Sequence, residues 1–462
     1  MSKSRMSRTE KLLIIGVVLA FALLLVLMVF SVMLNSAASG TLYSDPPFAI
    51  SSLISDVERD AAEVSVGDYV LPAFIGVSTS PEGLGISIGE NVVRELYTMV
   101  APCLAAGLSA EPEADTAVNW AMLARNSRAV YIRYHSALPA AVLQGTAAAL
   151  CGMAEDGNDV TSVRELFLLL PDEQYGDCQV IVRDTSGNIW RYLCGKQGEY
   201  PTLAQAEEFV EGFASSFYRC RLVVRENGSV EPVFLERMRV RNVLMTPGTA
   251  VMMQENRVDD LKKLLQQYDF NPDKLNTHEE ADGTQVVVES HGVFRTQNDR
   301  LTYTAGVDGG ISLQEFIGYK ERYTMSDSLQ TACTIIEELR AIHPYYLGGD
   351  ASLLLTEVSR TEGQLRMVFR YTFDNLILDG CGPAVVVLVE DDRVISADLY
   401  AIALRAQGDF DSSYLEAGVL DRTDGTVWAD VTLTYPANFA NNNVYPVWTF
   451  YPEKQPLTEE NR

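Results

Sequence analysis

The sequence has few of the residue patterns by which catalytic, metal and cofactor sites are recognised. Its four histidines lie in separate segments, and no serine or cysteine close to them lies in the G-x-S-x-G pattern of a nucleophile elbow. No two cysteines form a C-x-x-C pair, so a zinc site has no support. The glycine-rich stretch from Gly83 to Gly89 lacks the dinucleotide and P-loop spacings and predicts a turn or hairpin. We therefore expect no catalytic residues, no metal and no cofactor.

Cysteine and positive charge are both scarce. Seven cysteines, an odd number, are too few and too scattered for a disulfide scaffold. Lysine and arginine number 36 against 62 aspartates and glutamates, which gives a net charge of −26. A field of that sign repels phosphate backbones, so the chain is not expected to bind nucleic acid. The histidines are expected to be ordinary structural or surface residues, and three acidic pairs to be solvated charges: Glu279-Glu280, Glu337-Glu338 and Asp391-Asp392.

One long apolar run stands out near the start of the chain. Leu12 to Leu34 contains 23 residues without a charge, and about 20 apolar residues in a helix span a bilayer core. Four basic residues precede the run, whereas the first charge after it is Asp45. The positive-inside rule then places the N-terminus in the cytoplasm and the rest of the chain outside the cell. We expect a single-pass protein of the cell membrane.

A cleaved signal peptide is the alternative reading of this run. The small residues from Ser36 to Ser39 could supply a cleavage site. A signal peptide's apolar region is about 7 to 15 residues long, however, and this one is far longer. The length favours an uncleaved anchor.

The anchor carries a pair of small residues at helical spacing. Gly16 and Ala20 are four residues apart, the small-xxx-small arrangement that lets two transmembrane helices approach closely. Such pairs also arise by chance, so the alternative is that the helix is only a tether. The pair is a candidate packing site for a membrane partner.

The remaining chain predicts an α+β ectodomain of helix-plus-antiparallel-sheet modules, because runs of strands dominate over strand-helix alternation. Apolar periodicity predicts helices at 92–106, 114–125, 138–154, 203–217, 257–268 and 327–342. The expected parts are a cytoplasmic tail at 1–11, a transmembrane helix at 12–34, a tether at 35–50, a first α+β unit at 51–240, a small helix-plus-sheet module at 241–317, a C-terminal helix-plus-sheet module at 318–452 and a tail at 453–462.

A β-hairpin is predicted between Cys178 and Cys194. Two apolar runs flank the turn sequence from Asp184 to Asn188. Because strand side chains alternate with period two, the facing pairs should be Val182 with Trp190, Val180 with Tyr192 and Cys178 with Cys194. The cysteines are a candidate cross-strand pair, with proximity expected more firmly than a bond.

The second and third modules resemble the YycH and YycI proteins, membrane-anchored accessory regulators of the WalK sensor histidine kinase in Gram-positive bacteria. The resemblance rests on the basic tail, the single helix and the module layout, and on four stretches: Asp282 to Arg295, Leu301 to Ala305, Phe369 to Val389, and Val394 to Tyr400. It implies a non-enzymatic regulator whose partner is a membrane protein such as a sensor kinase.

Two other functions fit the same sequence. One is an exported hydrolase of envelope material with a site assembled from dispersed acids, and the other is a binding module for a wall polymer or a peptide. An enzyme should show a pocket in which titratable groups converge, whereas a regulator need not.

The anchor leads to a direct prediction. Protein extracted from membranes should retain residues 1–34, because the apolar run is long enough to span a bilayer and too long for a signal peptide. N-terminal sequencing checks this, and a mature chain that began near Gly40 would show that the run is cleaved.

Overall fold

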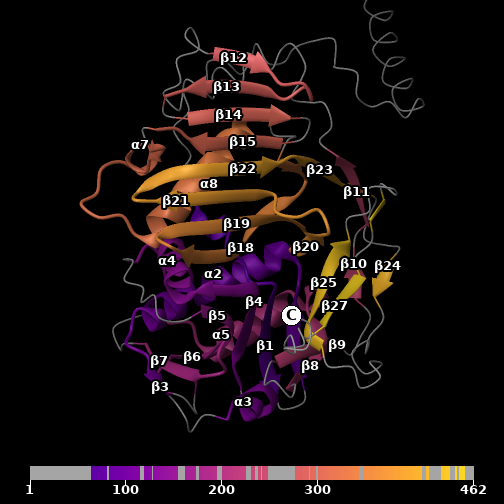
Figure 1. The fold of residues 1–462 in the computed structure, drawn as a ribbon. Helices are drawn as coiled ribbons and strands as arrows, with labels where there is room; N and C mark the ends of the chain where they lie inside the picture. The colour runs from indigo at the N-terminus through magenta and orange to yellow at the C-terminus, as the bar shows by residue number, and fades with distance from the viewer. Residues whose placement is uncertain are drawn as a thin grey trace, which may run out of the picture. The chain divides into compact units, whose positions relative to one another are not determined.

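The computed structural model describes residues 64–452, apart from gaps at 81–82, 115–118, 127, 154–161, 173–175, 195–199, 225–229, 235–237, 241, 248–275, 291, 298–299, 308, 343–346, 408–412, 416–427, 437–442 and 445–446. These residues form a mixed α+β fold with two large, mainly antiparallel sheets and few helices (Figure 1). Among the described helices, none is long and apolar enough to cross a membrane. The expected anchor, with Gly16 and Ala20, lies outside the described residues, as does the helix expected at 257–268.

The first sheet, called the N-terminal sheet below, has nine strands in the order β3-β7-β6-β5-β4-β1-β2-β8-β9. Neighbouring strands are antiparallel throughout. The strands are β1 (Phe74–Ser80), β2 (Gly83–Ser87), β3 (Glu113–Ala114), β4 (Val130–Pro139), β5 (Ser162–Leu169), β6 (Gln179–Asp184), β7 (Ile189–Leu193), β8 (Tyr218–Val224) and β9 (Val230–Phe234).

Helices α2 (Glu90–Leu108) and α4 (Ala140–Cys151) pack against each other and against strands of this sheet. Both helices bury small residues at their contacts, including Ala105, Gly107 and Ala147, which allow close approach. Two further helices are α3 (Trp120–Asn126) and α5 (Leu203–Gly212). A capping box at Thr202 begins α5, which ends five residues before its expected end and gives way to the 3-10 turn η3 (Ala214–Ser216).

The second sheet, called the C-terminal sheet below, has twelve strands, ten of them in the order β12-β13-β14-β15-β22-β21-β19-β20-β25-β27. Strand β16 also pairs with β22, and β18 pairs with β19. The strands are β12 (Asn276–Glu279), β13 (Gln285–Glu289), β14 (Gly292–Gln297), β15 (Arg300–Ala305), β16 (Ile311–Ser312), β18 (Ser352–Thr361), β19 (Gln364–Phe373), β20 (Leu376–Asp379), β21 (Val385–Glu390), β22 (Arg393–Tyr400), β25 (Trp428–Pro436) and β27 (Val447–Pro452).

Helix α8 (Met325–Ile342) lies against one face of this sheet, and the short helix α7 (Gln314–Ile317) precedes it (Figure 1). The buried residues of α8 include Leu329, Ile335 and Ile336, which lie on one face of the helix. Two small sheets complete the described fold: β17-β23-β11-β26, built from β17 (Leu347–Gly349), β23 (Ile402–Gln407), β11 (Asn242–Pro247) and β26 (Asn443–Val444), and β10-β24, built from β10 (Met238–Val240) and β24 (Ser413–Leu415).

The two modules expected at 241–317 and 318–452 share one sheet. Strand β15 of the first pairs with β22 of the second, from Arg300 opposite Tyr400 to Thr304 opposite Ser396. The strands of the two segments therefore form one continuous ladder. Which segments fold independently stays a prediction.

The register expected for the hairpin between β6 and β7 is confirmed. Val180 lies opposite Tyr192 and Val182 opposite Trp190. Beyond the ladder, the backbone N–H of Cys194 donates to the carbonyl of Cys178 at 3.1 Å. Asp184 fixes the turn, because its carboxylate accepts hydrogen bonds from the backbone N–H groups of Ser186 and Asn188.

Candidate functional site

The described segment that directly precedes the first sheet is mostly buried, with only Ser65 and Asp68 exposed. It comprises residues 64–73, includes the 3-10 turn η2 (Val66–Asp68) and packs against α4 and α8. Tyr69 in its centre is only 2% exposed. A β-carbon on Gly67 would lie 2.5 Å from Cδ2 of Leu150 at the end of α4, so a larger residue would require the Leu150 side chain to move. We call the region where this segment, β4, β18 and α8 meet the seam.

Tyr69 makes contacts with α8 and two strands of the C-terminal sheet. Its hydroxyl donates to the carboxylate of Glu337, which also pairs with Arg340 at 3.1 Å. Its ring meets the ring of Phe369 edge-on, with centroids 5.9 Å apart, and the Arg340 guanidinium carbon lies 6.0 Å from its centroid. Its backbone carbonyl accepts from the N–H of Leu355 at 2.7 Å. Burial raises the pKa of the Tyr69 hydroxyl far above its ordinary value, so it stays a donor.

Both ends of the buried segment are held by side-chain amides of the C-terminal half. At one end the Gln330 amide donates to the carbonyl of Val64 at 3.0 Å. At the other, the Asn375 amide nitrogen donates to the carbonyls of Pro72 at 2.8 Å and Ala73 at 3.2 Å. Asn375 is fully buried in the turn between β19 and β20, with φ 65°, a left-handed conformation that asparagine tolerates. These bonds satisfy backbone carbonyls that the insertion removes from water.

Strands β4 and β18 contact each other across the seam, each at an irregularity of its own ladder. The register of β4 against β5 shifts between Arg133 and Leu138. The register of β18 against β19 shifts at Thr356. Between them, the Ser136 hydroxyl donates to the carbonyl of Thr356. Bulges leave backbone groups unpaired and re-aim side chains. Here the two irregular stretches form one of the connections between the sheets.

A polar chain on exposed and half-buried residues ties α2 to the same place. The Ser352 hydroxyl donates to both carboxylate oxygens of Glu90, at 2.9 and 3.0 Å. Glu90 pairs with Arg94 one turn along α2, at 3.0 Å, and Arg94 also pairs with Asp68 of the buried segment. Since such pairs are exposed to solvent, they contribute to orientation more than to stability.

His135 lies in the irregular part of β4 and faces the side chain of Asn375. Removal from water, opposed by Asn375 and aided by the charges of Arg164 and Arg133, lowers its pKa to about 4. Its Nε2 and the amide oxygen of Asn375 make no hydrogen bond of ordinary geometry within the described part of the chain. The imidazole is therefore neutral at pH 7 and sensitive to acid.

The seam joins structural parts rather than gathering reactive groups around a cavity. An apolar pocket lies nearby, between α8 and the C-terminal sheet, and its lining contains no carboxylate, lysine, arginine or histidine: Phe294, Leu301, Tyr303, Ile311, Ile335, Leu339, Val394, Ala397 and Leu399. Over the described residues, no group of three or more histidine, cysteine or acidic side chains is placed to hold a metal ion. What the seam can do is transmit displacement of residues 64–73 to both sheets.

Most of the residues singled out from the sequence lie away from the seam, whereas Glu337 and His135 belong to it. Cys178 and Cys194 are buried free thiols at the base of the β6–β7 hairpin, and their role as a site stays a prediction. Glu279 and Asp391-Asp392 are exposed, as expected. Glu337 departs from the expectation of a plain solvated charge, because it accepts the hydrogen bond of Tyr69.

Two features escaped the reading of the sequence. The run Tyr69-Val70-Leu71 is apolar and would have signalled a buried segment after the tether. Gly85 to Gly89 does spell G-x-S-x-G between a strand and a helix. Ser87, however, is fully buried within β2, paired with Ile75 and without positive φ, so it lacks the exposed, strained geometry of a nucleophile elbow.

Comparison with known proteins gives one similarity, and it is one of fold. No family model matches the sequence, and no curated protein does. The crystal structure of YycH from Bacillus subtilis matches with a TM-score of 0.52 at 10% sequence identity, covering 83% of this chain and 94% of that chain. The resemblance predicted from the sequence is thus confirmed at the level of the fold.

Removing the Tyr69 ring should weaken the whole described fold. Tyr69→Ala should lower the free energy of unfolding by about 3 to 5 kcal/mol, the usual cost of deleting a buried aromatic side chain. Tyr69→Phe keeps the ring and should cost about 1 kcal/mol for the lost hydrogen bond. Urea unfolding measures both. The matched control is Tyr319→Ala, because Tyr319 is 76% exposed, and equal losses for Tyr69→Ala and this control would contradict the assignment.

His135 should make the protein sensitive to mild acid. Its pKa is about 4 in the folded protein, whereas an unfolded histidine titrates near 6.5. As pH falls from about 6.5 to 4, the unfolded chain takes up this proton and the folded chain does not, so stability decreases across that window. His135→Gln should flatten this part of the curve of unfolding free energy against pH. The exposed His278→Gln is the control, and identical curves for both variants and the parent chain would refute the prediction.

Proposed function

We propose that this chain is a membrane-anchored, extracytoplasmic accessory protein that regulates a sensor histidine kinase of the WalK type without catalysing a reaction. The observation that carries the proposal is the YycH fold, whose match extends over 94% of that chain. The uninterrupted apolar run at 12–34 supports the membrane anchor, and its flanking charges support the orientation.

The seam supports the proposal, because it attaches the first described residues to both sheets of the ectodomain. Residues 64–73 lie between the expected tether at 35–50 and the N-terminal sheet in sequence. They are hydrogen-bonded to the C-terminal half through Leu355, Gln330 and Asn375. A force on this segment is therefore resisted by both sheets. A protein that binds one state of its partner more tightly than another shifts the partner toward that state.

The proposal is tested by crosslinking in native membranes followed by affinity capture of this chain. We expect a sensor histidine kinase among the recovered proteins. Recovery of wall polymer or a peptide in place of any kinase would favour a binding module. Turnover of envelope material by the purified full chain, abolished by substitution of a single acid, would favour the hydrolase.

The anchor itself should contribute to partner binding. Gly16→Leu combined with Ala20→Leu adds bulk to the expected packing face, while the hydrophobicity needed for insertion remains. Export and membrane retention should be unchanged, and crosslinking to the kinase should fall. Leu25→Ile is the control and should have little effect. Undiminished crosslinking after replacement of the whole span by an unrelated transmembrane helix would show that the helix is only a tether.

A further inference from the structure

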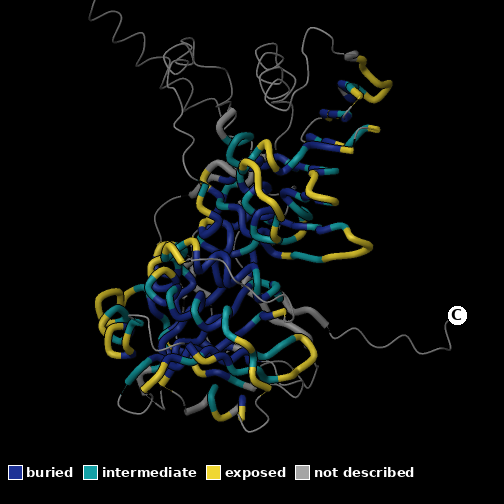
Figure 2. The backbone as a smooth tube through the Cα atoms, turned by 90° about the vertical axis from the view of Figure 1, so that its left-hand side faces the viewer, coloured by how far each residue is buried: buried dark blue, intermediate teal, exposed yellow. Residues whose placement is uncertain are grey.

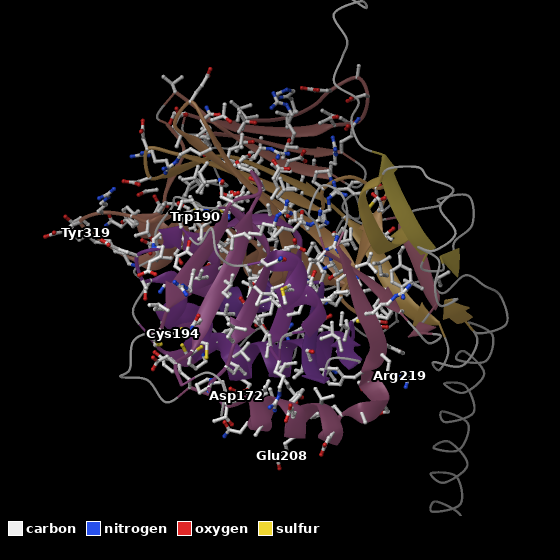
Figure 3. All side chains as sticks on the ribbon, turned by 90° about the horizontal axis from the view of Figure 1, so that it is seen from below. Asp172, Trp190, Cys194, Glu208, Arg219 and Tyr319 are labelled. Atoms are coloured by element: carbon white, nitrogen blue, oxygen red, sulfur yellow. The ribbon has the colours of Figure 1, made fainter. Side chains whose placement is uncertain are left out.

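Three of the seven cysteines gather in the buried layer between α2 and the N-terminal sheet. Cys103 on α2, Cys178 before β6 and Cys194 after β7 are each at most 5% exposed. The thiol of Cys178 is within hydrogen-bonding reach of the thiols of both Cys103 and Cys194. The thiol of Cys194 donates to the backbone carbonyl of Cys103 at 3.3 Å. Figure 3 shows the sulfur atoms grouped beside the Cys194 label.

The backbone geometry of the hairpin disfavours a bond between its own two cysteines. The N–H of Cys194 donates directly to the carbonyl of Cys178, which marks a hydrogen-bonded pair, the wider of the two antiparallel pairings. Facing β-carbons there lie toward the upper end of about 4.5 to 5.5 Å, whereas a disulfide needs about 3.5 to 4.5 Å. A bond across the hairpin would have to distort the ladder.

The packing of α2 on β6 instead aligns Cys103 with Cys178. Gly107 lies one helical turn beyond Cys103 and contacts the hairpin closely. A β-carbon on Gly107 would lie 2.3 Å from Cγ2 of Val180, two residues beyond Cys178, and 3.3 Å from the sulfur of Cys194. The close approach at Gly107 brings α2 near the strand, and the thiol of Cys178 lies within hydrogen-bonding reach of the thiol of Cys103.

We propose that Cys103 and Cys178 form a disulfide that links α2 to the β6–β7 hairpin, with Cys194 as a neighbouring free thiol. A thiolate of the pair attacks the disulfide of a glutathione-type or protein oxidant and releases one thiolate from it. The second cysteine then attacks the mixed disulfide and expels the other. Two cysteine thiols lose two protons and two electrons, and the oxidant's disulfide becomes two thiols. The proposed placement outside the cell supplies such an oxidant. The proximity of Cys103 and Cys178 does not depend on that placement.

The burial of the three cysteines determines whether their thiols react during folding or after it. The hydrogen bond with Cys103 and burial raise the pKa of the Cys178 thiol, and the hydrogen bond with Cys178 and burial raise that of Cys194. Few thiolates are then present in the folded protein, and an oxidant reaches them only when the structure opens. The bond therefore forms while the chain folds and afterwards resists reduction.

The test uses the full chain refolded from denaturant in a buffer of reduced and oxidised glutathione. The product is then unfolded, alkylated without reduction and mapped by mass spectrometry. We expect peptides of Cys103 and Cys178 joined and Cys194 alkylated. Cys194→Ser should leave that disulfide in place, and Cys178→Ser should abolish every disulfide of the cluster. Adding oxidised glutathione only after folding should slow the reaction by at least about tenfold, because access then requires opening.

The control for folding is Cys220→Ser, since Cys220 is equally buried but lies outside the cluster. It should refold and retain the bond between Cys103 and Cys178. A map of the folded parent chain with all three cysteines alkylated would overturn the proposal. So would a map in which Cys178 joined to Cys194 exceeds Cys178 joined to Cys103. Because purified protein is used, neither result depends on the regulatory role or the membrane anchor.

Discussion

The burial of residues 64–73 between the two sheets is the constraint on which the rest of the structure depends. Each large apolar side chain removed from water there contributes about 1.5 to 3 kcal/mol. The backbone carbonyls removed with them are satisfied by Leu355, Gln330 and Asn375, all from the C-terminal half. A short segment at the start of the described chain therefore has its partners some 260 to 300 residues further along the sequence.

This arrangement makes one core out of two sheets. Buried residues run without interruption from the N-terminal sheet through the seam into the C-terminal sheet (Figure 2). The irregularities of β4 and β18 lie where these two strands meet. In a regular ladder the Thr356 carbonyl would bond within its own sheet, whereas here it accepts from the Ser136 hydroxyl of the other sheet. Within the described residues, the segment 64–73 is therefore packed into the same core as both sheets.

Local features of the fold followed from the sequence, and long-range ones did not. Helix α8 was expected within two residues of its bounds, because helical spacing is a local signal. The register of Val180 with Tyr192 followed from the turn alone. Nothing local relates Tyr69 to Glu337, or β15 to β22 across about 95 residues, because such pairings are decided by packing. The YycH resemblance was visible from layout, whereas the cluster of Cys103 with the hairpin required the position of α2.

Native-state hydrogen exchange at the seam tests the central claim, that the inserted segment makes the two sheets one cooperative unit. The informative amide is that of Leu355, which donates to the carbonyl of Tyr69. Its opening free energy should equal that of core amides in both sheets, such as Ile132 and Phe369, and should fall with urea along the same line. Opening of Leu355 at a much lower free energy, with Ile132 still protected, would show that the seam is a loose contact between independent sheets.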